Sequence, residues 1–189
     1  EHHFASGDVS LSAVIFPPIM NTMLGHDVGA GRGAKIIYDG IKNRRAEQWH
    51  QTLPFATSWW RALGLMPNTF AIESFIDEMA LKSGKNPVEF RLKKIANEEN
   101  SLRIRKVIET AAKKGIYTDN VENGHAKGIA VSKDANSIAA HVAEVSIENG
   151  KIKVHKVTCA FDCGKVVNPD QVKAQCEGSI IMGMSAAMF

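Results

Sequence analysis

The stretch IAAHVAEVSIENGKIKVHKVTCAF, residues 138–161, decides the fold. Apolar and polar residues alternate through it on both sides of Asn149 and Gly150. The Asn-Gly dipeptide readily adopts the positive backbone dihedrals of a two-residue turn, and it therefore marks the tip of a β-hairpin. We expect antiparallel strands at about 138–148 and 151–160.

The second strand of this hairpin contains an irregularity. Its apolar alternation shifts register between Val154 and Val157, which predicts a β-bulge near His155. His155 and His141 are expected to be strand residues that face solvent, rather than metal ligands.

The residues before the hairpin change from a helical to a strand period. Apolar residues recur at three- and four-residue spacing, with capping residues before them and glycines after them. The spacing predicts three helices and one further strand, at about 69–83, 87–98, 102–114 and 126–132. Asn68 is the expected N-cap of the first helix, and Asn86 is that of the second, with Pro87 in its first turn. The fold class is therefore α+β: an antiparallel or mixed sheet with the hairpin at 138–160 packs against several helices.

A last helix is expected over 169–189, because Asn168 and Pro169 form a helix start and no stop signal follows. Gly178 and Gly183 leave much of this helix without bulk, either for tight packing on the sheet or because it lines a large cofactor. Its apolar residues include Ile181, so we expect exposed apolar surface, with the result that the chain self-associates or has a disordered C-terminal turn.

Composition excludes several classes of protein. The 189 residues are 44% hydrophobic and 23% charged, which is typical of a globular domain. No apolar run approaches the length of a membrane span, and three cysteines are not the pattern of a disulfide framework. The net charge of +3 does not require nucleic acid, and the basic side chains at 103–114 are interpreted as a solvated helix surface with no nucleic-acid partner.

Ordinary catalytic patterns are missing from the sequence. The glycine-rich segment GHDVGAGRG, residues 25–33, lacks the strand and helix of a dinucleotide loop and is interpreted as a mobile turn. The following AKIIYDG, residues 34–40, is typical of a short strand. Cys159 and Cys163 have the wrong spacing for a redox or zinc pair and are interpreted as small buried residues. We expect no metal ligand and no catalytic residue in this chain.

Two separated segments carry a family resemblance. They are SWWRALGLMPNTFAIESFIDEMALKSGKNPVEFRL, residues 58–92, and the sequence from His141 to Phe189. In this order they resemble the molybdopterin-binding large subunit of the xanthine dehydrogenase and aldehyde oxidase family, most closely its isoquinoline 1-oxidoreductase branch. The resemblance implies that residues 56–189 are part of a molybdopterin-binding domain. Residues 1–55 contribute little to the resemblance and are expected to be an irregular N-terminal segment with a short strand.

The resemblance also implies roles for residues in the first of these segments. Trp60 matches the family's aromatic position and is expected in the substrate pocket, while Arg61 is expected to contact the cofactor. Gly64 matches the glycine-rich part of the same motif, but Ala62 departs from the form found in the xanthine enzymes. This departure leaves the substrate class open. The alternative for Arg61 is an ordinary surface arginine.

The second segment resembles a cofactor-contacting helix of the family. Gln175 and Gly178 match its glutamine and glycine positions and are expected to bind the cofactor. Gln175 would meet the polar edge of the pterin, and Gly178 would let the backbone approach it. The alternative for Gln175 is an exposed helix residue without this role.

The implied function is that of a molybdenum hydroxylase subunit. Such an enzyme oxidises an N-heteroaromatic compound or an aldehyde with oxygen from water, and works with an iron-sulfur electron-transfer subunit. The cofactor would be molybdopterin in its cytosine dinucleotide form. The family's catalytic glutamate has no counterpart among these 189 residues, so we expect the isolated chain to be inactive and to lack cofactor. The alternative is a noncatalytic binding or scaffold domain with the same fold. The expected compartment is the cytoplasm, or the periplasm if a preceding segment carries a signal.

Overall fold

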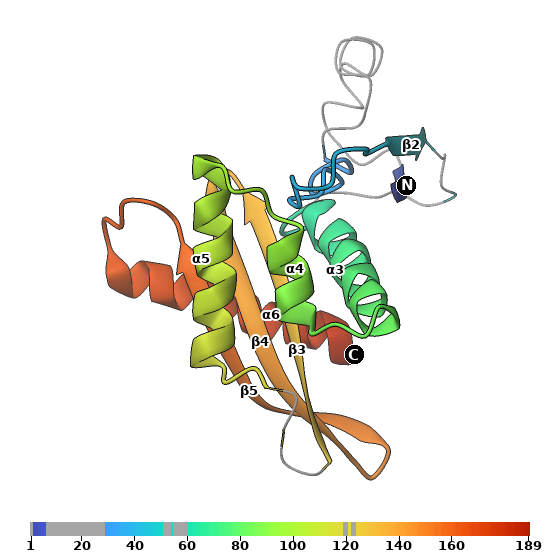
Figure 1. Ribbon diagram of the computed structural model, residues 1–189. Coiled ribbons are helices and arrows are strands. Elements are labelled where there is room, and N and C mark those ends of the chain that lie inside the picture. The colour runs from blue at the N-terminus through green and yellow to red at the C-terminus, as the bar shows by residue number, and fades with distance from the viewer. Residues whose placement is uncertain (1, 7–28, 51–53, 55–59, 119–120, 122–123) are drawn as a thin grey trace. The chain divides into compact units, whose positions relative to one another are not determined.

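The computed structural model describes residues 2–6, 29–50, 54, 60–118, 121 and 124–189 (Figure 1). The chain forms two compact units, Glu1–Met79 and Ala80–Phe189, and each is described by itself. The domain boundary expected between residues 55 and 56 falls in the undescribed stretch 55–59 and stays a prediction.

The first unit contains a pair of short parallel strands, β1 (His2–Ser6) and β2 (Ala46–His50). The strand predicted at residues 34–40 is wrong, because these residues form turns with local backbone hydrogen bonds. Tyr38 lies fully buried in that segment, and its hydroxyl donates a hydrogen bond of 2.6 Å to Glu73 Oε1. A buried tyrosine anchored by its hydroxyl therefore replaces strand pairing in holding the segment.

Helix α3 (Leu65–Lys82) begins four residues before the predicted start, and it carries the chain from the first unit into the second. The predicted N-cap role of Asn68 is wrong, because Asn68 lies inside the first turn of α3 and is only 6% exposed. Its side-chain amide donates instead to the carbonyl oxygens of Ala30 and Arg32, at 2.8 and 2.9 Å. Asn68 thus makes long-range hydrogen bonds, although the local preference of asparagine is for an N-cap position.

The second unit contains a three-stranded antiparallel sheet in the order β3 (His125–Asp134), β4 (Ser137–Glu148) and β5 (Lys151–Asp162). The predicted hairpin is confirmed, with positive φ angles of 52° at Asn149 and 75° at Gly150. The predicted bulge is confirmed as well. Glu144 pairs with Lys156 while the next residue, Val145, pairs with Val154, so His155 is the extra residue.

Two helices precede this sheet. Helix α4 (Pro87–Lys93) is capped by Asn86 as predicted, whose Oδ1 accepts from the backbone N–H of Val88 at 2.9 Å. The helix ends at Lys93 rather than at residue 98, and Arg105 on the next helix donates to the carbonyl oxygens of Leu92 and Ile95 around this point. That next helix, α5, spans Glu99–Lys114 and begins three residues before its predicted start at 102.

Helix α5 covers one face of the sheet and contributes to the core of the second unit (Figure 1). Ile138, Ala140 and Val142 alternate along β4 and are buried on this face. A Cβ at Gly115, directly after α5, would come within 2.7 Å of Val142 Cβ, so the helix end lies very close to the strand. The apolar face of β4 thus packs against the apolar face of α5 that the residue spacing predicts.

A bidentate ion pair fixes α5 to the far end of β5. Arg103 donates from Nη2 to Asp162 Oδ1 at 2.7 Å and from Nε to Oδ2 at 2.9 Å. Asp162 also accepts from the backbone N–H of Gly164 at 2.8 Å. One member of the basic helix surface predicted at 103–114 is therefore engaged within the protein.

The last helix, α6 (Pro169–Met188), lies against the other face of the sheet (Figure 1). Asn168 caps it as predicted, since its Oδ1 accepts from Gln171 N at 3.1 Å. None of its residues is buried, and Ile181 is 62% exposed. Among the described residues, no helix combines the length and apolar character needed to cross a membrane. The α+β class is confirmed.

The Arg103–Asp162 pair should make the fold sensitive to acid. Arg103 and the Gly164 amide lower the pKa of Asp162 to about 2, from an unfolded value of about 3.9. A group whose folded pKa is depressed contributes stability above its unfolded pKa, and this contribution is lost as the pH falls toward the folded value. We expect Asp162→Asn to lower the urea midpoint at pH 7 and to cost progressively less between pH 4 and pH 2. Glu109→Gln, at an exposed position in the interior of α5, is the control. An Asp162→Asn effect that does not change with pH would contradict the assignment.

The exposed face of α6 generates a second prediction. We expect the 189-residue chain to self-associate, and Ile181→Asp to reduce this association while the hairpin at Asn149 stays folded. Light scattering over a concentration series measures the association, and circular dichroism measures the fold. Leu102→Asp is the matched control, because Leu102 is 50% exposed but lies on α5. A parent chain that remains a monodisperse monomer at high concentration would refute the prediction.

Candidate cofactor-contacting residues

The residues singled out in the sequence lie in both units. Trp60 and Arg61 precede α3 in the first unit, whereas Gln175 and Gly178 lie on α6 in the second. All four are exposed, and Trp60 has 66% of its surface accessible. The structure brings Gln175 and Gly178 together on one helix, and it presents Trp60 and Arg61 side by side on one turn.

The turn that carries Arg61 has an unusual backbone. Ala62 and Leu63 have φ angles of 73° and 53°, in the left-handed region that side chains other than glycine seldom occupy. Each such residue costs of order 1 kcal/mol and persists only where the surroundings enforce it. Here Leu63 N donates to Trp60 O at 2.9 Å, and the following Leu65 N donates to Ala62 O at 3.0 Å. The departure from glycine noted at Ala62 thus coincides with backbone that glycine would adopt more easily.

Gly64 closes this turn against the glycine-rich segment. Its N–H donates to Gly29 O at 2.9 Å, and a Cβ at Gly64 would overlap the carbonyl group of Ala30. Residues 29–33, the described part of the segment interpreted as a mobile turn, do form a turn, and its mobility stays a prediction. These residues are connected by hydrogen bonds to Gly64 and Asn68 that no local pattern in the sequence indicates.

Helix α6 presents the other two candidates on an open surface. Gln175 and Gly178 are three residues apart and so share a helix face. Among the residues that the structure describes, no atom lies within 4 Å of a Cβ built at Gly178, and the same holds for Gly183. The expected tight packing of these glycines on the sheet is therefore not what they do within this chain. Their backbone is instead accessible to a group that approaches from outside.

The cysteines are arranged differently from the sequence expectation. Burial, together with the neighbouring thiol of Cys176 on α6, raises the pKa of Cys159 on β5 to about 12. Cys159 and Cys163 are half-buried rather than fully buried. Residues of the described chain supply no group of three or more side chains suited to hold a metal ion.

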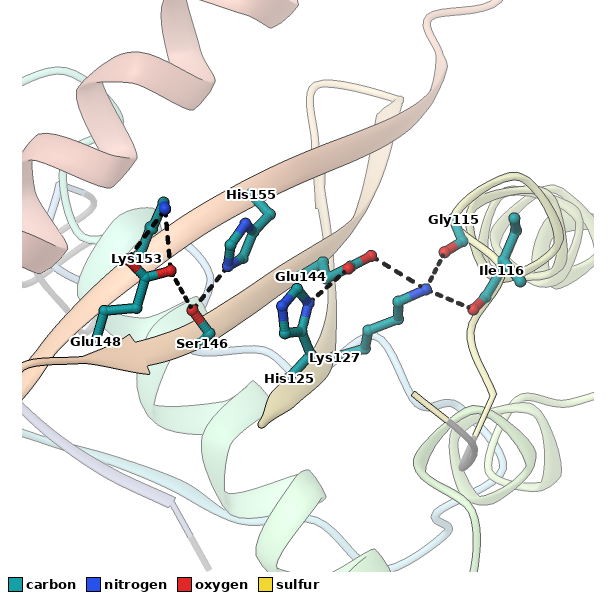
Figure 2. A network of polar contacts seen from close by, with 9 residues as sticks. All are labelled: Gly115, Ile116, His125, Lys127, Glu144, Ser146, Glu148, Lys153 and His155. Carbon is teal, nitrogen blue, oxygen red and sulfur yellow. Dashed lines mark hydrogen bonds and ion pairs between the residues drawn. The ribbon is translucent and has the colours of Figure 1, made fainter. Parts of the chain in front are cut away.

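A polar network that the sequence analysis missed lies where α5 ends (Figure 2). Glu144 on β4 binds His125 Nδ1 at 2.9 Å and Lys127 Nζ at 3.2 Å, both from β3. Lys127 also donates to the carbonyl oxygens of Gly115 and Ile116, at 3.2 and 3.0 Å. The hydrogen bonds from His125 and Lys127 lower the pKa of Glu144. Lys127 thus places a positive charge at the negative end of the α5 dipole.

The same network continues across the sheet to the bulge (Figure 2). The rings of His125 and His155 stack with centroids 4.3 Å apart and planes 19° from parallel. His155 Nε2 shares a hydrogen bond of 2.7 Å with Ser146 Oγ, on the strand between them. Glu148 lies next in line, with Ser146 Oγ at 3.4 Å and Lys153 Nζ at 3.0 Å, and their hydrogen bonds lower its pKa. The bulge therefore aims His155 at a partner two strands away.

His141 differs from His155. It was expected to face solvent, but it lies half-buried opposite Cys159 on the face that α6 covers, and burial lowers its pKa. His155 is exposed as expected. The alternation of residues along the two strands places Lys127 and Glu144 on the same face of the sheet. That they lie opposite each other follows only from the β3–β4 register, which the sequence alone does not give.

Chemically, the exposed candidates offer recognition rather than bond-breaking. The amide of Gln175 can both donate and accept hydrogen bonds, and the guanidinium of Arg61 supplies a fixed cation with several donors. Gly178 supplies accessible backbone without a side chain. Each of these groups can bind a polar or anionic part of a ligand, and redox chemistry would require a cofactor.

Comparison with known proteins gives a family. Residues 55–189 match the molybdopterin cofactor-binding domain. The beta subunit of isoquinoline 1-oxidoreductase from Brevundimonas diminuta is 32% identical over an alignment of 192 residues. This alignment covers 99% of this chain and 24% of that protein. A nicotinate dehydrogenase subunit from Pseudomonas putida is 31% identical over 69% of this chain and 12% of its own length.

A third relative has a different name. The membrane-bound aldehyde dehydrogenase [pyrroloquinoline-quinone] of Gluconacetobacter polyoxogenes is 26% identical over 87% of this chain and 22% of its own length. No solved structure matches the chain. The chain spans about a quarter or less of each of these relatives. The match over 55–189 includes the turn with Arg61 and the whole of α6, and the chain belongs to the molybdopterin cofactor-binding domain family.

Proposed function

We propose that this chain is a cofactor-proximal part of a molybdenum hydroxylase subunit that oxidises an N-heteroaromatic compound or an aldehyde with oxygen taken from water. The observation that carries the proposal is the family match over residues 55–189. Two of the relatives are named for oxidising isoquinoline and nicotinate, which are both N-heteroaromatic, and this favours that substrate class over aldehydes.

The exposed residues of α6 fit a large cofactor. A pterin has a polar edge with hydrogen-bond donors and acceptors, which the amide of Gln175 can match. The open space at Gly178 lets such a group come closer to the helix backbone than any other residue would permit. The helix is also well defined where it begins, because Asn168 caps its first turn. We therefore assign Gln175 and Gly178 to cofactor binding.

Arg61 and Trp60 are assigned complementary roles. Arg61 holds a fixed positive charge toward the cofactor or toward a polarised oxygen of the substrate, a task that the planar guanidinium performs better than an ammonium. Trp60 offers a large exposed aromatic surface, 66% accessible, against which a flat heterocycle can stack. The bound molybdenum cofactor would supply the redox chemistry, while these residues bind and orient.

Further parts of the enzyme belong to the same proposal. We assign an iron-sulfur subunit as the electron-transfer partner and the cytosine dinucleotide form of molybdopterin as the cofactor. The isoquinoline and nicotinate relatives are both named as subunits, which supports a multi-subunit enzyme. Because the chain spans 24% of the isoquinoline relative, we propose that these 189 residues alone do not turn over substrate.

The decisive experiment is a cofactor analysis of the full-length subunit purified with its partner. We expect close to one molybdenum per subunit, a fluorescent oxidised pterin on denaturation, and oxidation of an N-heteroaromatic substrate that incorporates labelled oxygen from water. A folded complex that repeatedly lacks both molybdenum and pterin would refute the proposal. Recovery of a quinone cofactor instead would favour the chemistry named for the aldehyde dehydrogenase relative, and absence of any cofactor would favour a noncatalytic domain.

The two open glycines of α6 provide a matched pair of variants. Alanine gains roughly 0.8–1 kcal/mol over glycine in a helix interior, and neither position has an atom within 4 Å to clash with. We therefore expect Gly178→Ala and Gly183→Ala to raise the urea midpoint of the 189-residue chain equally. In the full enzyme we expect Gly178→Ala alone to lower the molybdenum content, because its methyl group occupies the cofactor's approach. Equal molybdenum content in both variants would remove Gly178 from the site.

A further inference from the structure

The segment Gly29–Gly33 and the turn Trp60–Gly64 are joined by hydrogen bonds. The side-chain amide of Asn68, on the first turn of α3, donates to Ala30 O at 2.8 Å and to Arg32 O at 2.9 Å. Gly64 N donates to Gly29 O at 2.9 Å. These three hydrogen bonds connect one short loop with the beginning of α3. We call the segment Gly29–Gly33 the docking loop.

The contacts in this arrangement leave little freedom. A Cβ at Gly64 would overlap the carbonyl group of Ala30. Gly33 has a φ of 79°, and a Cβ there would come within 2.8 Å of Leu65 Cδ1 and 3.1 Å of Leu65 Cα. The docking loop therefore requires glycine where it meets the turn and α3.

The turn Trp60–Gly64 has a backbone conformation that is unfavourable in isolation. Ala62 and Leu63 both have left-handed φ angles, although neither is glycine. Backbone in this region is maintained by surroundings that over-determine it. Among the described residues, Asn68 is the buried side chain that ties the start of α3 to the docking loop, since it is 6% exposed and its amide nitrogen donates twice there.

We propose that Asn68 is a positioning residue for Arg61: its amide fixes the docking loop, and the docking loop fixes the left-handed turn from which Arg61 projects. The proposal deepens the proposed function and rests on it for the role of Arg61 toward the cofactor. Asn68 itself touches neither cofactor nor substrate in this scheme.

We call the hydrogen bonds between Asn68 and the docking loop the lock. The lock requires an amide donor at position 68. Two carbonyl oxygens face the nitrogen of Asn68, so a residue of the same shape must donate to satisfy them. Asn68→Asp keeps the shape but turns acceptor oxygens toward acceptor carbonyls. Asn68→Ala removes the donors altogether. Both substitutions should release the docking loop, and Asn68→Asp does so with the smaller change in packing volume.

The first measurement follows the turn directly. The chain has three tryptophans, so Trp49→Phe together with Trp59→Phe leaves Trp60 as the sole reporter beside Arg61. We expect the time-resolved anisotropy of Trp60 to show a larger amplitude of fast motion in Asn68→Asp and Asn68→Ala. Asn86→Ala is the matched control, because Asn86 likewise makes structural hydrogen bonds but caps α4 in the second unit. Unchanged Trp60 motion in folded Asn68 variants would overturn the proposal.

The second measurement uses the full-length subunit purified with its partner. We expect Asn68→Asp to lower the molybdenum and pterin content at least fivefold, because two donated hydrogen bonds of about 1 kcal/mol each are lost. We expect Asn86→Ala, at a comparable loss in unfolding midpoint, to leave that content unchanged. Faster Trp60 motion with full cofactor content would overturn the positioning role while the lock itself stands. A wild-type enzyme without molybdenum and pterin would instead refute the proposed function, and the anisotropy would still report on the lock.

Discussion

The register of β4 is the constraint on which the second unit depends. Because side chains alternate along a strand, the register decides that Ile138, Ala140 and Val142 face α5 and that His141 faces α6. A shift by one residue would put His141 into the core and expose the apolar residues. The Asn149-Gly150 turn sets this register from one end, and the Arg103–Asp162 pair holds α5 to the strand beside it at the other.

The bulge at His155 interrupts this register and lets β5 contact β3 through a side chain. Beyond the bulge, β5 is displaced by one residue relative to β4, and the extra residue reaches over Ser146 to stack on His125. The outer strands β3 and β5 are thereby connected across the middle one. Lys127 extends the same network to the carbonyls that end α5. One set of side chains thus stabilises both the carboxyl end of α5 and the association of the three strands.

Features that depend on neighbouring residues could be predicted from the sequence, and features that depend on distant ones could not. The hairpin, its bulge and the caps at Asn86 and Asn168 are local, so composition and spacing suffice to find them. Asn68 has the composition of a cap, yet carbonyls more than 30 residues away decide its role. For the site, resemblance supplied Arg61 and Gln175, whereas the interactions that hold the Arg61 turn became visible only in three dimensions.

Glycine illustrates the same distinction in the candidate site. In the sequence, Gly64 and Gly178 have equal standing, since both match family positions near a cofactor. The structure separates them by what surrounds each one. Gly64 is required by the protein itself, because the backbone at Ala30 occupies the space of its side chain. Gly178 is required by no contact within the described chain, and as an interior glycine it lowers the stability of the helix relative to alanine. Gly183 lies in the same open surroundings, so the free space at Gly178 does not by itself distinguish the two glycines, and the reason for glycine at position 178 lies outside the contacts that the described residues make.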